Sequence, residues 1–506
     1  MTIGRTQAVA LQGLLGTVID IECDISDGIP MYSLLGLPDA SLQESRDRVR
    51  AALSNTGQKW PNKKVTVSLS PAWLPKSGPG FDVAIALALL VADGVIPQAP
   101  MDGAIILGEL SLDGAIRSVR GVLPSLIAAY TSGLTRAIVP RANLREAELM
   151  ENMEILSFEH ISEIYRWALT GEYPFNEPLD LDIENVDEIL DFSDVAGQSR
   201  ARFAAEVAAT GGHHLLLIGP PGAGKTMIAS RIPSILPPLT VEEALEVTAI
   251  HSIAGGLTKR SPMSRVAPII APHHSATRAS IVGGGGRSIS PGAISLGHRG
   301  VLFIDEAPEC ASGILDSLRQ PLESGNITIA RQIGNVTFPA QFLLVLAANP
   351  CPCGKFSGKG RGCTCSSLQV RRYLGKLSGP LMDRIDIRVS VDPVGRVELA
   401  STELGESSAD IRNRVIGARG RAAQRFKDEP WTLNSQIPAR SLRTTYSPDR
   451  SAMNFLHDEL DKENITARGL HKVIRLSWTL ADLAGHAKPT LDDVQRAFLL
   501  RDGGDY

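Results

Sequence analysis

The sequence predicts an α/β protein with a parallel sheet near its middle and a helical domain at its C-terminal end. Three observations support this fold class. Short runs of β-branched residues alternate with helical stretches over residues 1–170 and again from about 193 to 390. The loop GPPGAGKT, residues 219–226, joins an apolar run to a helical stretch. Beyond residue 391 strand signals are few, and ARGLHKVIRLSWTLADLAG has apolar residues at helical spacing.

The N-terminal region, residues 1–170, is expected to form a compact mixed α/β domain. Its strand signals are TVIDIEC (17–23), KVTVSLS (64–70), GAIILGELSL (103–112) and RAIVP (136–140), and its helical stretches are residues 41–57 and 81–94. Residues 171–192 are acidic and contain two prolines, which indicates a linker. Arg46, Arg48 and Arg50 are expected on the solvated face of a helix.

Length and composition are those of an ordinary globular protein. The 506 residues suffice for about three domains. With 21% charged residues and a net charge of -4, overall charge neither favours nor excludes nucleic acid. The N-terminal segment lacks the basic start and apolar core of a signal peptide. The most apolar run, 83–96, is interrupted by Asp93 and Gly94 and is too short to span a bilayer, so we expect a cytoplasmic protein.

The loop at 219–226 matches the pattern G-x-x-x-x-G-K-[ST] in a strand–loop–helix context. Its glycines allow successive backbone N–H groups to point at phosphate oxygens, and the helix N-terminus adds its dipole. Lys225 is expected to reach the β- and γ-phosphates, and Thr226 to ligate Mg²⁺. The residues expected to cradle ATP are Gly219, Pro220, Pro221, Gly222, Ala223, Gly224, Lys225 and Thr226.

Two later strands end in polar residues suited to phosphoryl transfer. GVLFIDEAPE, residues 300–309, ends a buried run in Asp305 and Glu306. A carboxylate at Asp305 is expected to hold Mg²⁺, and Glu306 to orient or deprotonate the attacking water. FLLVLAANP, residues 342–350, ends in Asn349, whose amide is expected to hold that water. The sequence therefore predicts hydrolysis of ATP with Mg²⁺.

Four of the six cysteines lie in CPCGKFSGKGRGCTC as two C-x-C pairs, Cys351 with Cys353 and Cys363 with Cys365. Four thiolates favour a closed, structural Zn²⁺ site, and metal binding would order an intervening loop too polar to build a core. A redox-labile disulfide pair and inert thiols are the alternatives. The loop is basic, as is the following QVRRYLGK, so it is expected to grip DNA phosphates. Cys23 and Cys310 are expected to be ordinary buried cysteines.

The order of these motifs resembles that of an AAA+ ATPase. The nucleotide loop precedes the DE strand, the Asn-tipped strand, LSGPLMDRIDI at 377–387 and ARGL at 467–470. Longer stretches resemble the magnesium chelatase-like family of the ComM and YifB type, namely PHHSATRASIVGGGGRSISPGAISLGHRGVLFIDE, SLRQPLESGNITIAR and LAANPCPCG. The resemblance covers essentially the whole chain. It implies a hexameric ring that uses ATP to drive branch migration of DNA junctions during recombination.

The resemblance also implies roles for single residues. Lys225 and Thr226 match Walker A, Asp305 and Glu306 match Walker B, Asn349 matches sensor 1, Arg384 matches the arginine finger that reaches a neighbouring subunit, and Arg468 matches sensor 2. Arg319 and Arg475 compete for the two arginine roles, and an intramolecular ion pair is the plain alternative for either arginine. A trans finger typically contributes about 10³–10⁵ in rate, so hydrolysis is expected to need a closed ring.

Two insertions fit this branch of AAA+ proteins. Residues 273–295 are expected to extend from the core, and residues 326–342 to form a hairpin that turns at Gly334-Asn335. Both are expected to line a central pore or to remain surface hairpins without a ligand. The arginine-dense stretch 411–427 is expected either to contact DNA or to be a solvated helix face.

The N-terminal region resembles the proteolytic domain of Lon in LSPAWLPKSGPGFDVAIALALL and GELSLDGAIRSVRGVLPSLIAA. Lon enzymes use a serine nucleophile that is activated by a lysine. The chain has Gly80 at the serine position and Leu123 at the lysine position. Without nucleophile and base the covalent mechanism cannot start, so we expect no protease activity. Ser77 and Lys76 lie nearby but at the wrong positions.

Two other functions compete with a DNA motor. One is a chelatase-type motor subunit that drives Mg²⁺ into a porphyrin. Such a subunit would need neither the Lon-like region nor the cysteine loop. The other is an ATP-driven protein remodeller. It would favour aromatic pore loops, whereas the insertions are rich in Gly, Ser, His and Arg.

Overall fold

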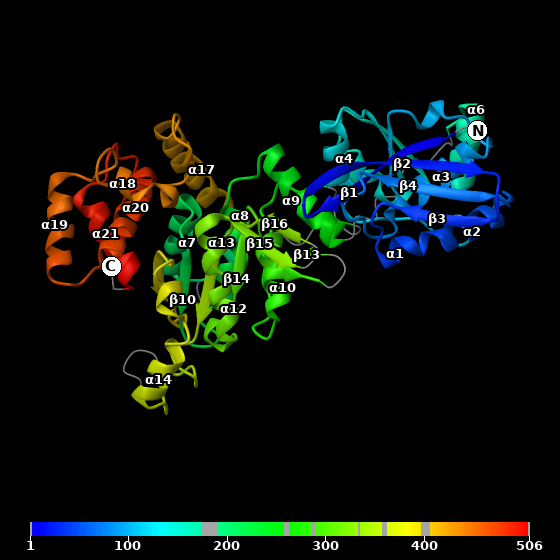
Figure 1. Ribbon diagram of the computed structural model, residues 1–506. Helices are drawn as coiled ribbons and strands as arrows, with labels where there is room; N and C mark the ends of the chain where they lie inside the picture. The colour runs from blue at the N-terminus through cyan, green and yellow to red at the C-terminus, as the bar shows by residue number, and fades with distance from the viewer. Residues whose placement is uncertain are drawn as a thin grey trace.

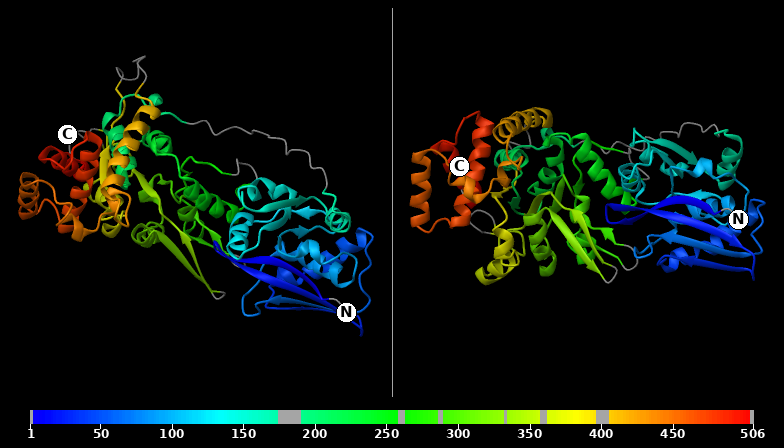
Figure 2. Two further views of the ribbon diagram at one scale, coloured as in Figure 1. Left: turned by 90° about the horizontal axis from the view of Figure 1, so that it is seen from above. Right: turned by 45° about the horizontal axis from the view of Figure 1, so that its top comes forward.

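The computed structural model describes residues 3–173, 190–257, 263–285, 289–331, 334–356, 362–395 and 405–503. The chain forms an elongated molecule with three regions in sequence order, coloured blue to cyan, green to yellow and orange to red (Figure 1). Both views in Figure 2 place the N-terminal region and the helical C-terminal region at opposite ends. Most of the expected linker, residues 174–189, lies outside the described residues.

The N-terminal region is built on a seven-stranded mixed sheet in the order β3-β4-β2-β1-β5-β8-β9. Its strands are β1 (Gly4–Gln12), β2 (Leu15–Ser26), β3 (Met31–Leu35), β4 (Lys64–Ser70), β5 (Ala104–Ile106), β8 (Arg136–Pro140) and β9 (Glu154–Phe158), and a small pair is formed by β6 (Glu109–Leu110) and β7 (Ile116–Arg117). All four expected strand segments are strands, the third being divided into β5 and β6. The sequence did not predict β1, β3, β7 or β9.

The helices of this region surround the sheet. They are α1 (Ala40–Gln43), α2 (Ser45–Asn55), α3 (Asp82–Ala92), α4 (Val122–Thr131), α5 (Leu144–Ala147) and α6 (Ile161–Thr170). Helix α3 is buried from Asp82 to Val91, because an all-apolar helix has no face suited to water. Arg48 on α2 pairs with the buried Asp82 at 2.6 Å, so the expectation that it lies on a solvated face was wrong.

The central region contains a five-stranded parallel sheet in the order β11-β14-β17-β10-β18. The strands are β10 (Leu215–Ile218), β11 (Ile269–Ile270), β14 (Val301–Ile304), β17 (Leu343–Ala348) and β18 (Ile387–Ser390). Every residue of β14 and β17 is buried, as expected of a parallel sheet covered on both faces. The surrounding helices are α7 (Ser199–Gly211), α8 (Lys225–Ile235), α9 (Val241–Ala254), α12 (Ser312–Ser317), α13 (Arg319–Ser324), α14 (Ser367–Leu374) and α15 (Gly379–Met382).

Both insertions are structured. The first contains α10 (Arg278–Val282), the short antiparallel pair β12 (Gly283–Gly284) and β13 (Ser290–Pro291), and α11 (Ala293–Leu296). The second is the hairpin of β15 (Asn326–Arg331) and β16 (Gly334–Pro339). Its register pairs Arg331 with Gly334, so Gly334 and Asn335 belong to the second strand rather than to the turn. The expectation that the hairpin turns at Gly334-Asn335 was therefore wrong.

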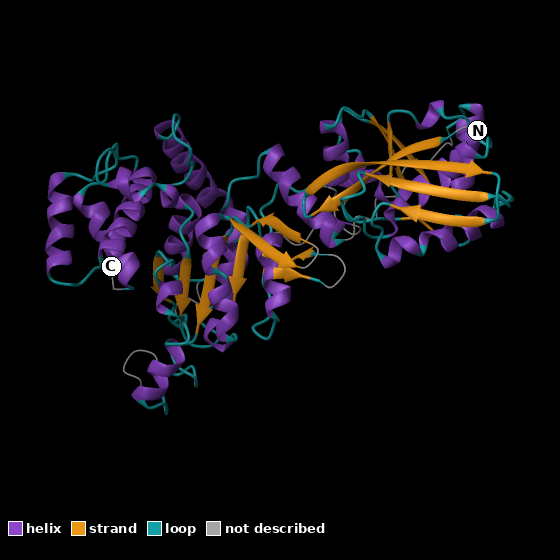
Figure 3. Ribbon diagram, viewed as in Figure 1, coloured by secondary structure: helices purple, strands orange, loops and turns teal. Residues whose placement is uncertain are grey.

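The C-terminal region consists of helices, as Figure 3 shows for the described residues. They are α17 (Ser408–Arg425), α18 (Ala439–Leu442), α19 (Arg450–Asp461), α20 (Ala467–Ala484) and α21 (Leu491–Asp502). Tyr446 lies at the centre of an aromatic cluster in this region, because its ring makes edge contacts with Phe426, Trp431 and Trp478. In the described part of the chain, each helix is too short or too polar to span a membrane.

The N-terminal region contacts the central region through α4 and α9. The N–H of Gly121 donates to the carbonyl of Ser252 at 3.3 Å. The Ser252 hydroxyl in turn donates to the carboxylate of Glu146, which also accepts the N–H of Leu123 at 2.7 Å. Burial raises the pKa of Glu146, and its hydrogen bonds oppose that rise. A buried carboxylate thus joins two segments of the N-terminal region to α9.

Candidate nucleotide site and cysteine centre

The glycine-rich loop connects β10 to α8 and requires glycine at several positions. Gly222 and Gly224 have φ values of 77° and 94°, in the left-handed region that other residues seldom adopt. A Cβ at Gly219 would lie 2.1 Å from the carbonyl oxygen of Val391. Since α8 begins at Lys225, the loop delivers backbone N–H groups and the helix N-terminus to one place, which is the arrangement that binds phosphate.

Lys225 and Asn349 meet at this loop although 124 residues separate them. The Lys225 ammonium donates to Asn349 Oδ1 at 3.1 Å and to the carbonyls of Gly219 and Pro220 at 2.6 and 3.0 Å. Burial lowers the pKa of Lys225, and the charges of Asp305 and Glu306 oppose this. Asn349 follows β17, which lies between the strands that carry the loop and the DE pair.

Thr226 and Asp305 form the pair expected to hold magnesium. The Thr226 hydroxyl donates to Asp305 Oδ2 at 2.7 Å, and the N–H of Glu306 donates to Asp305 Oδ1 at 2.8 Å. A hydroxyl and a carboxylate are hard oxygen ligands of the kind Mg²⁺ prefers. The residues therefore fit the ion, which would neutralise charge on bridging phosphate oxygens. Glu306 has a φ of 49°, in the left-handed region, so the main chain turns directly after the strand end.

His274 contacts Glu306, a contact that the sequence analysis did not anticipate. His274 Nδ1 lies 3.0 Å from Glu306 Oε2, and the His274 ring stacks on His273 with centroids 4.1 Å apart. The two histidines follow β11, which pairs in parallel with β14, so both chain segments leave the sheet at the same edge. The insertion that begins here therefore reaches the residue expected to activate water. The one sequence signal for this contact is that His274 lies in PHHSAT, at the start of a stretch that resembles the family.

Of the four arginines considered for the site, Arg384, Arg468 and Arg475 have partners within the described part of the chain. Arg384 forms an ion pair with Glu323 and donates to the carbonyl of Pro380 at 2.6 Å. Arg468 pairs with Asp383 at 3.3 Å, but its side chain is 80% exposed, so this pair is weak. Arg475 donates both its Nε and Nη2 to the carbonyl of Ile437. Arg319 is exposed on α13. None of these contacts joins an arginine to the glycine-rich loop.

The four clustered cysteines converge. Their sulfur atoms all lie within 4.8 Å of one another, and three of the distances are 3.4, 3.6 and 3.7 Å. Tetrahedral Zn²⁺ with Zn–S bonds of about 2.3 Å would place sulfurs about 3.8 Å apart, so the cluster fits structural zinc. Cys23 and Cys310 are buried elsewhere, as expected.

The cysteine loop touches the glycine-rich loop directly. A Cβ placed on Gly354 would lie 2.6 Å from the ring of Pro221, so the two loops are in close contact. Helix α14 follows the cysteines and projects from the central region (Figure 1). It carries the exposed Arg371 and Arg372, and Lys376 follows it. Lys355 and Phe356 are also exposed, whereas Lys359 and Arg361 lie outside the described residues.

The arginines of helix α17 bind partners within the chain, although Arg414 and Arg421 are exposed. Arg414 pairs with Glu206 and Glu406, and Arg425 pairs with the buried Asp482 at 2.6 Å. Arg419 donates to the carbonyl of Ala209, and Arg421 to that of Asp482. These arginines therefore fasten the helical region to α7 and α20, an alternative that the sequence analysis did not consider.

Gly80 and Leu123, which stand at the serine and lysine positions of Lon, make structural contacts. Leu123 is buried, and its N–H binds Glu146 as described above. The carbonyl of Gly80 accepts the N–H of Gly108 at 3.1 Å. Lys76 is fully buried, and its ammonium donates to the carbonyls of Leu69 and Pro71, while Ser77 is exposed.

The nucleotide loop, the DE pair and the Asn-tipped strand between them, on a parallel sheet followed by a helical domain, define an ATPase of the AAA+ type. The chain belongs to the magnesium chelatase family. The family model described as "Magnesium chelatase, subunit ChlI" matches residues 191–399. The models "Subunit ChlI of Mg-chelatase" and "Magnesium chelatase, subunit ChlI C-terminal" match residues 21–143 and 405–501.

Relatives extend over nearly the whole chain. An uncharacterized protein of Mycobacterium tuberculosis is 46% identical over 100% of this chain and 99% of its own length. The competence protein ComM of Haemophilus influenzae is 38% identical over 96% of this chain and 94% of its own length. The Lon protease of Clostridioides difficile is 26% identical over 35% of this chain and 24% of its own length. The expected family and fold class are thus confirmed.

Proposed function

We propose that this ATPase is a motor that acts on DNA and moves branch points in recombination intermediates. Lys225, Thr226 and Asp305 hold ATP and Mg²⁺, and Glu306 and Asn349 activate and orient the attacking water. Arg384 completes the site of a neighbouring subunit and Arg468 senses nucleotide, so the working form is a closed ring, expected to be a hexamer. The likeness to a competence protein supports a role in handling DNA.

One observation carries the DNA proposal. The cysteine loop contacts the glycine-rich loop at Pro221. Among the described residues, the loop and the segment after it present four exposed cations, Lys355, Arg371, Arg372 and Lys376. Lysine and arginine side chains neutralise phosphates, and exposed aromatic side chains such as Phe356 stack on bases. A change at the nucleotide would therefore pass directly to a surface suited to DNA. Zinc would hold this surface rigid by binding all four cysteines.

The test is ATP-dependent processing of a synthetic four-way junction and a three-strand branch by the purified protein. We expect migrated products from the parent chain and none from Lys225→Ala. The double variant Arg371→Ala/Arg372→Ala should lose DNA-stimulated turnover while keeping basal ATPase. Lys488→Ala, an exposed lysine of the helical region, is the matched control. Intact ATPase that ignores DNA would overturn the proposal.

A chelatase-type motor subunit is the second candidate, since all three matching family models carry that description. It predicts ATPase stimulated by a tetrapyrrole rather than by DNA. A protein remodeller predicts stimulation by unfolded protein instead. The same ATPase assay with porphyrin, junction DNA and unfolded casein therefore separates the three.

A further inference from the structure

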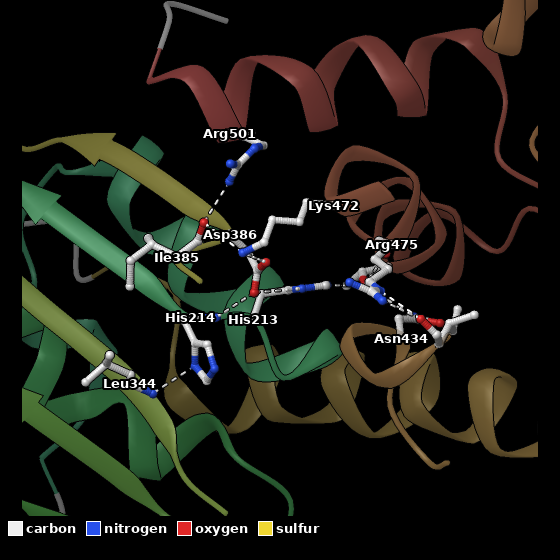
Figure 4. Close-up of polar contacts among 11 residues, drawn as sticks. His213, His214, Leu344, Ile385, Asp386, Asn434, Lys472, Arg475 and Arg501 are labelled. Carbon is white, nitrogen blue, oxygen red and sulfur yellow. Dashed lines mark hydrogen bonds and ion pairs between the residues drawn. The ribbon is translucent and has the colours of Figure 1, made fainter. Parts of the chain in front are cut away.

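A buried polar network joins the central sheet to the helical region beside Arg384 (Figure 4). Its centre is Asp386, whose side chain is only 10% exposed. From the core side, the N–H of His214 donates to Asp386 Oδ2 at 3.1 Å. From the helical side, Lys472 of α20 forms an ion pair with Asp386 Oδ1 at 2.8 Å, and the Lys472 side chain is 11% exposed.

The charge of Asp386 is balanced chiefly by Lys472, and His213 Nδ1 lies 3.7 Å from Asp386 Oδ2. Burial lowers the pKa of His214 to about 4, so its ring is neutral near pH 7. Consistent with this, His214 Nδ1 accepts the N–H of Leu344 at 3.1 Å. The Lys472 ion pair, in contrast, holds the pKa of Asp386 well below its usual range despite the cost of burial. A buried ion pair tolerates the loss of one partner poorly.

The helical region also binds the residues on either side of Arg384 in the chain. The carbonyl of Ile385, directly after Arg384, accepts from Arg501 Nη1 at 2.7 Å and from Lys472 Nζ at 3.2 Å. Directly before Arg384, Asp383 pairs with Arg468 at 3.3 Å. Arg468 and Lys472 stand four residues apart on one face of α20. Residues on both sides of Arg384 are therefore bound by α20 and α21.

The Arg384 side chain itself is incompletely satisfied. Its guanidinium contacts Glu323 and the carbonyl of Pro380, and the side chain is 18% exposed. Its Nε is buried and has no hydrogen-bond partner among the described residues. A buried donor without a partner raises the free energy of this conformation. This favours a second conformation in which Arg384 meets another anionic group.

We propose that Lys472 and Arg501 are positioning residues for Arg384, through which the helical region of one subunit sets whether that arginine reaches the nucleotide of the next. The inference rests on the proposed function, because it takes Arg384 as the trans finger. Lys472 never touches nucleotide in this scheme. It fixes Ile385 and Asp386, so a shift of α20 moves the Arg384 main chain and draws its side chain from Glu323.

The test is a double-mutant cycle on ATP turnover in the full-length chain. We expect Lys472→Met to lower kcat between about 10- and 100-fold, as for a misplaced reacting group, with KM for ATP unchanged. Lys472→Arg should restore most of the loss. In an Arg384→Ala background, Lys472→Met should cause no further loss. Lys462→Met, an exposed lysine paired with Glu459 on α19, is the matched control.

The outcomes separate the two ideas. Absence of ATPase in the parent chain would defeat the proposed function itself. Full activity of Arg384→Ala, a rise in KM, or additive losses in the double variant would overturn the role of Lys472 while leaving the ATPase intact. If Lys472→Met does not fold by its thermal melting curve, Arg501→Gln tests the same link through Ile385 alone and must show the same dependence on Arg384.

Discussion

The N-terminal region and the central region both resemble catalytic domains, but at the positions that each resemblance assigns to catalysis, only the central region carries the expected polar groups. At the core sheet, Lys225 and Asn349 are bonded to each other, and Thr226 is bonded to Asp305. In the Lon-like region, a buried leucine stands where the resemblance places the base. A fold can therefore persist where catalytic side chains are absent, because packing needs apolar volume whereas catalysis needs a few polar atoms.

The main chain at the position of the missing base takes part in the contact between the two regions. The backbone N–H of Leu123 binds Glu146, whose carboxylate also receives the hydroxyl of Ser252 on α9. The buried carboxylate thus links the Lon-like region to the helix that packs against it from the ATPase.

The largest effect should come from Glu306→Gln in the core. The amide keeps the shape but cannot accept a proton from water, so we expect kcat to fall at least about 100-fold. Nucleotide affinity should change little, because Glu306 is expected to contact water rather than phosphate. Steady-state ATPase and binding of a fluorescent ATP analogue measure both quantities. Glu309→Gln, a nearby exposed carboxylate paired with Lys376, should keep near-parental turnover; equal losses would refute the assignment.

The cysteine centre should respond next. We expect about one zinc per chain by metal analysis, and Cys363→Ser should weaken zinc binding by at least about 100-fold, since even outer-shell changes cost 10–100-fold. Cys310→Ser removes a buried thiol outside the cluster and should retain the metal. A metal-free protein with full ATPase and DNA response would contradict a structural zinc site.

Most of the nucleotide site was readable from sequence because its signals are local. A strand, a loop and a helix start lie within residues 213–232, and the strand ends carry their own polar residues. Parallel topology then brings those ends to one edge. The same logic predicted the clustering of four cysteines that stand within 15 residues of one another. In both cases the residues that form the site are close in sequence or end adjacent strands of one sheet.

What could not be predicted depends on distant partners. The arginines of α17 looked free because Glu206, which pairs with Arg414, is 208 residues away. Arg48 looked solvated because its partner Asp82 lies inside a helix with an apolar sequence. Strand β3 was missed because its residues are only partly buried at a sheet edge, which weakens alternation. Local patterns do not contain these pairings.

His274→Ala should have a smaller effect in the opposite direction. Its imidazole occupies Glu306 Oε2, which must be free to accept a proton from water. Removing this polar contact, worth about 1 kcal/mol, should raise basal kcat about 3- to 10-fold and reduce the factor by which DNA stimulates turnover. His273→Ala, which removes the stacked ring but no contact to Glu306, is the control. A fall in basal kcat would show that His274 supports Glu306 instead.

The smallest effect is expected where the comparison predicts none. Ser77→Ala should leave ATPase unchanged, and neither the parent chain nor the variant should cleave casein. The reason lies in Lys76, since its ammonium is committed to the carbonyls of Leu69 and Pro71. An ammonium that donates to two carbonyls cannot at the same time accept the proton of a serine hydroxyl. Casein cleavage that disappears in Ser77→Ala would mean that Lys76 leaves those carbonyls, and the Lon-like region would then have kept its chemistry with its fold.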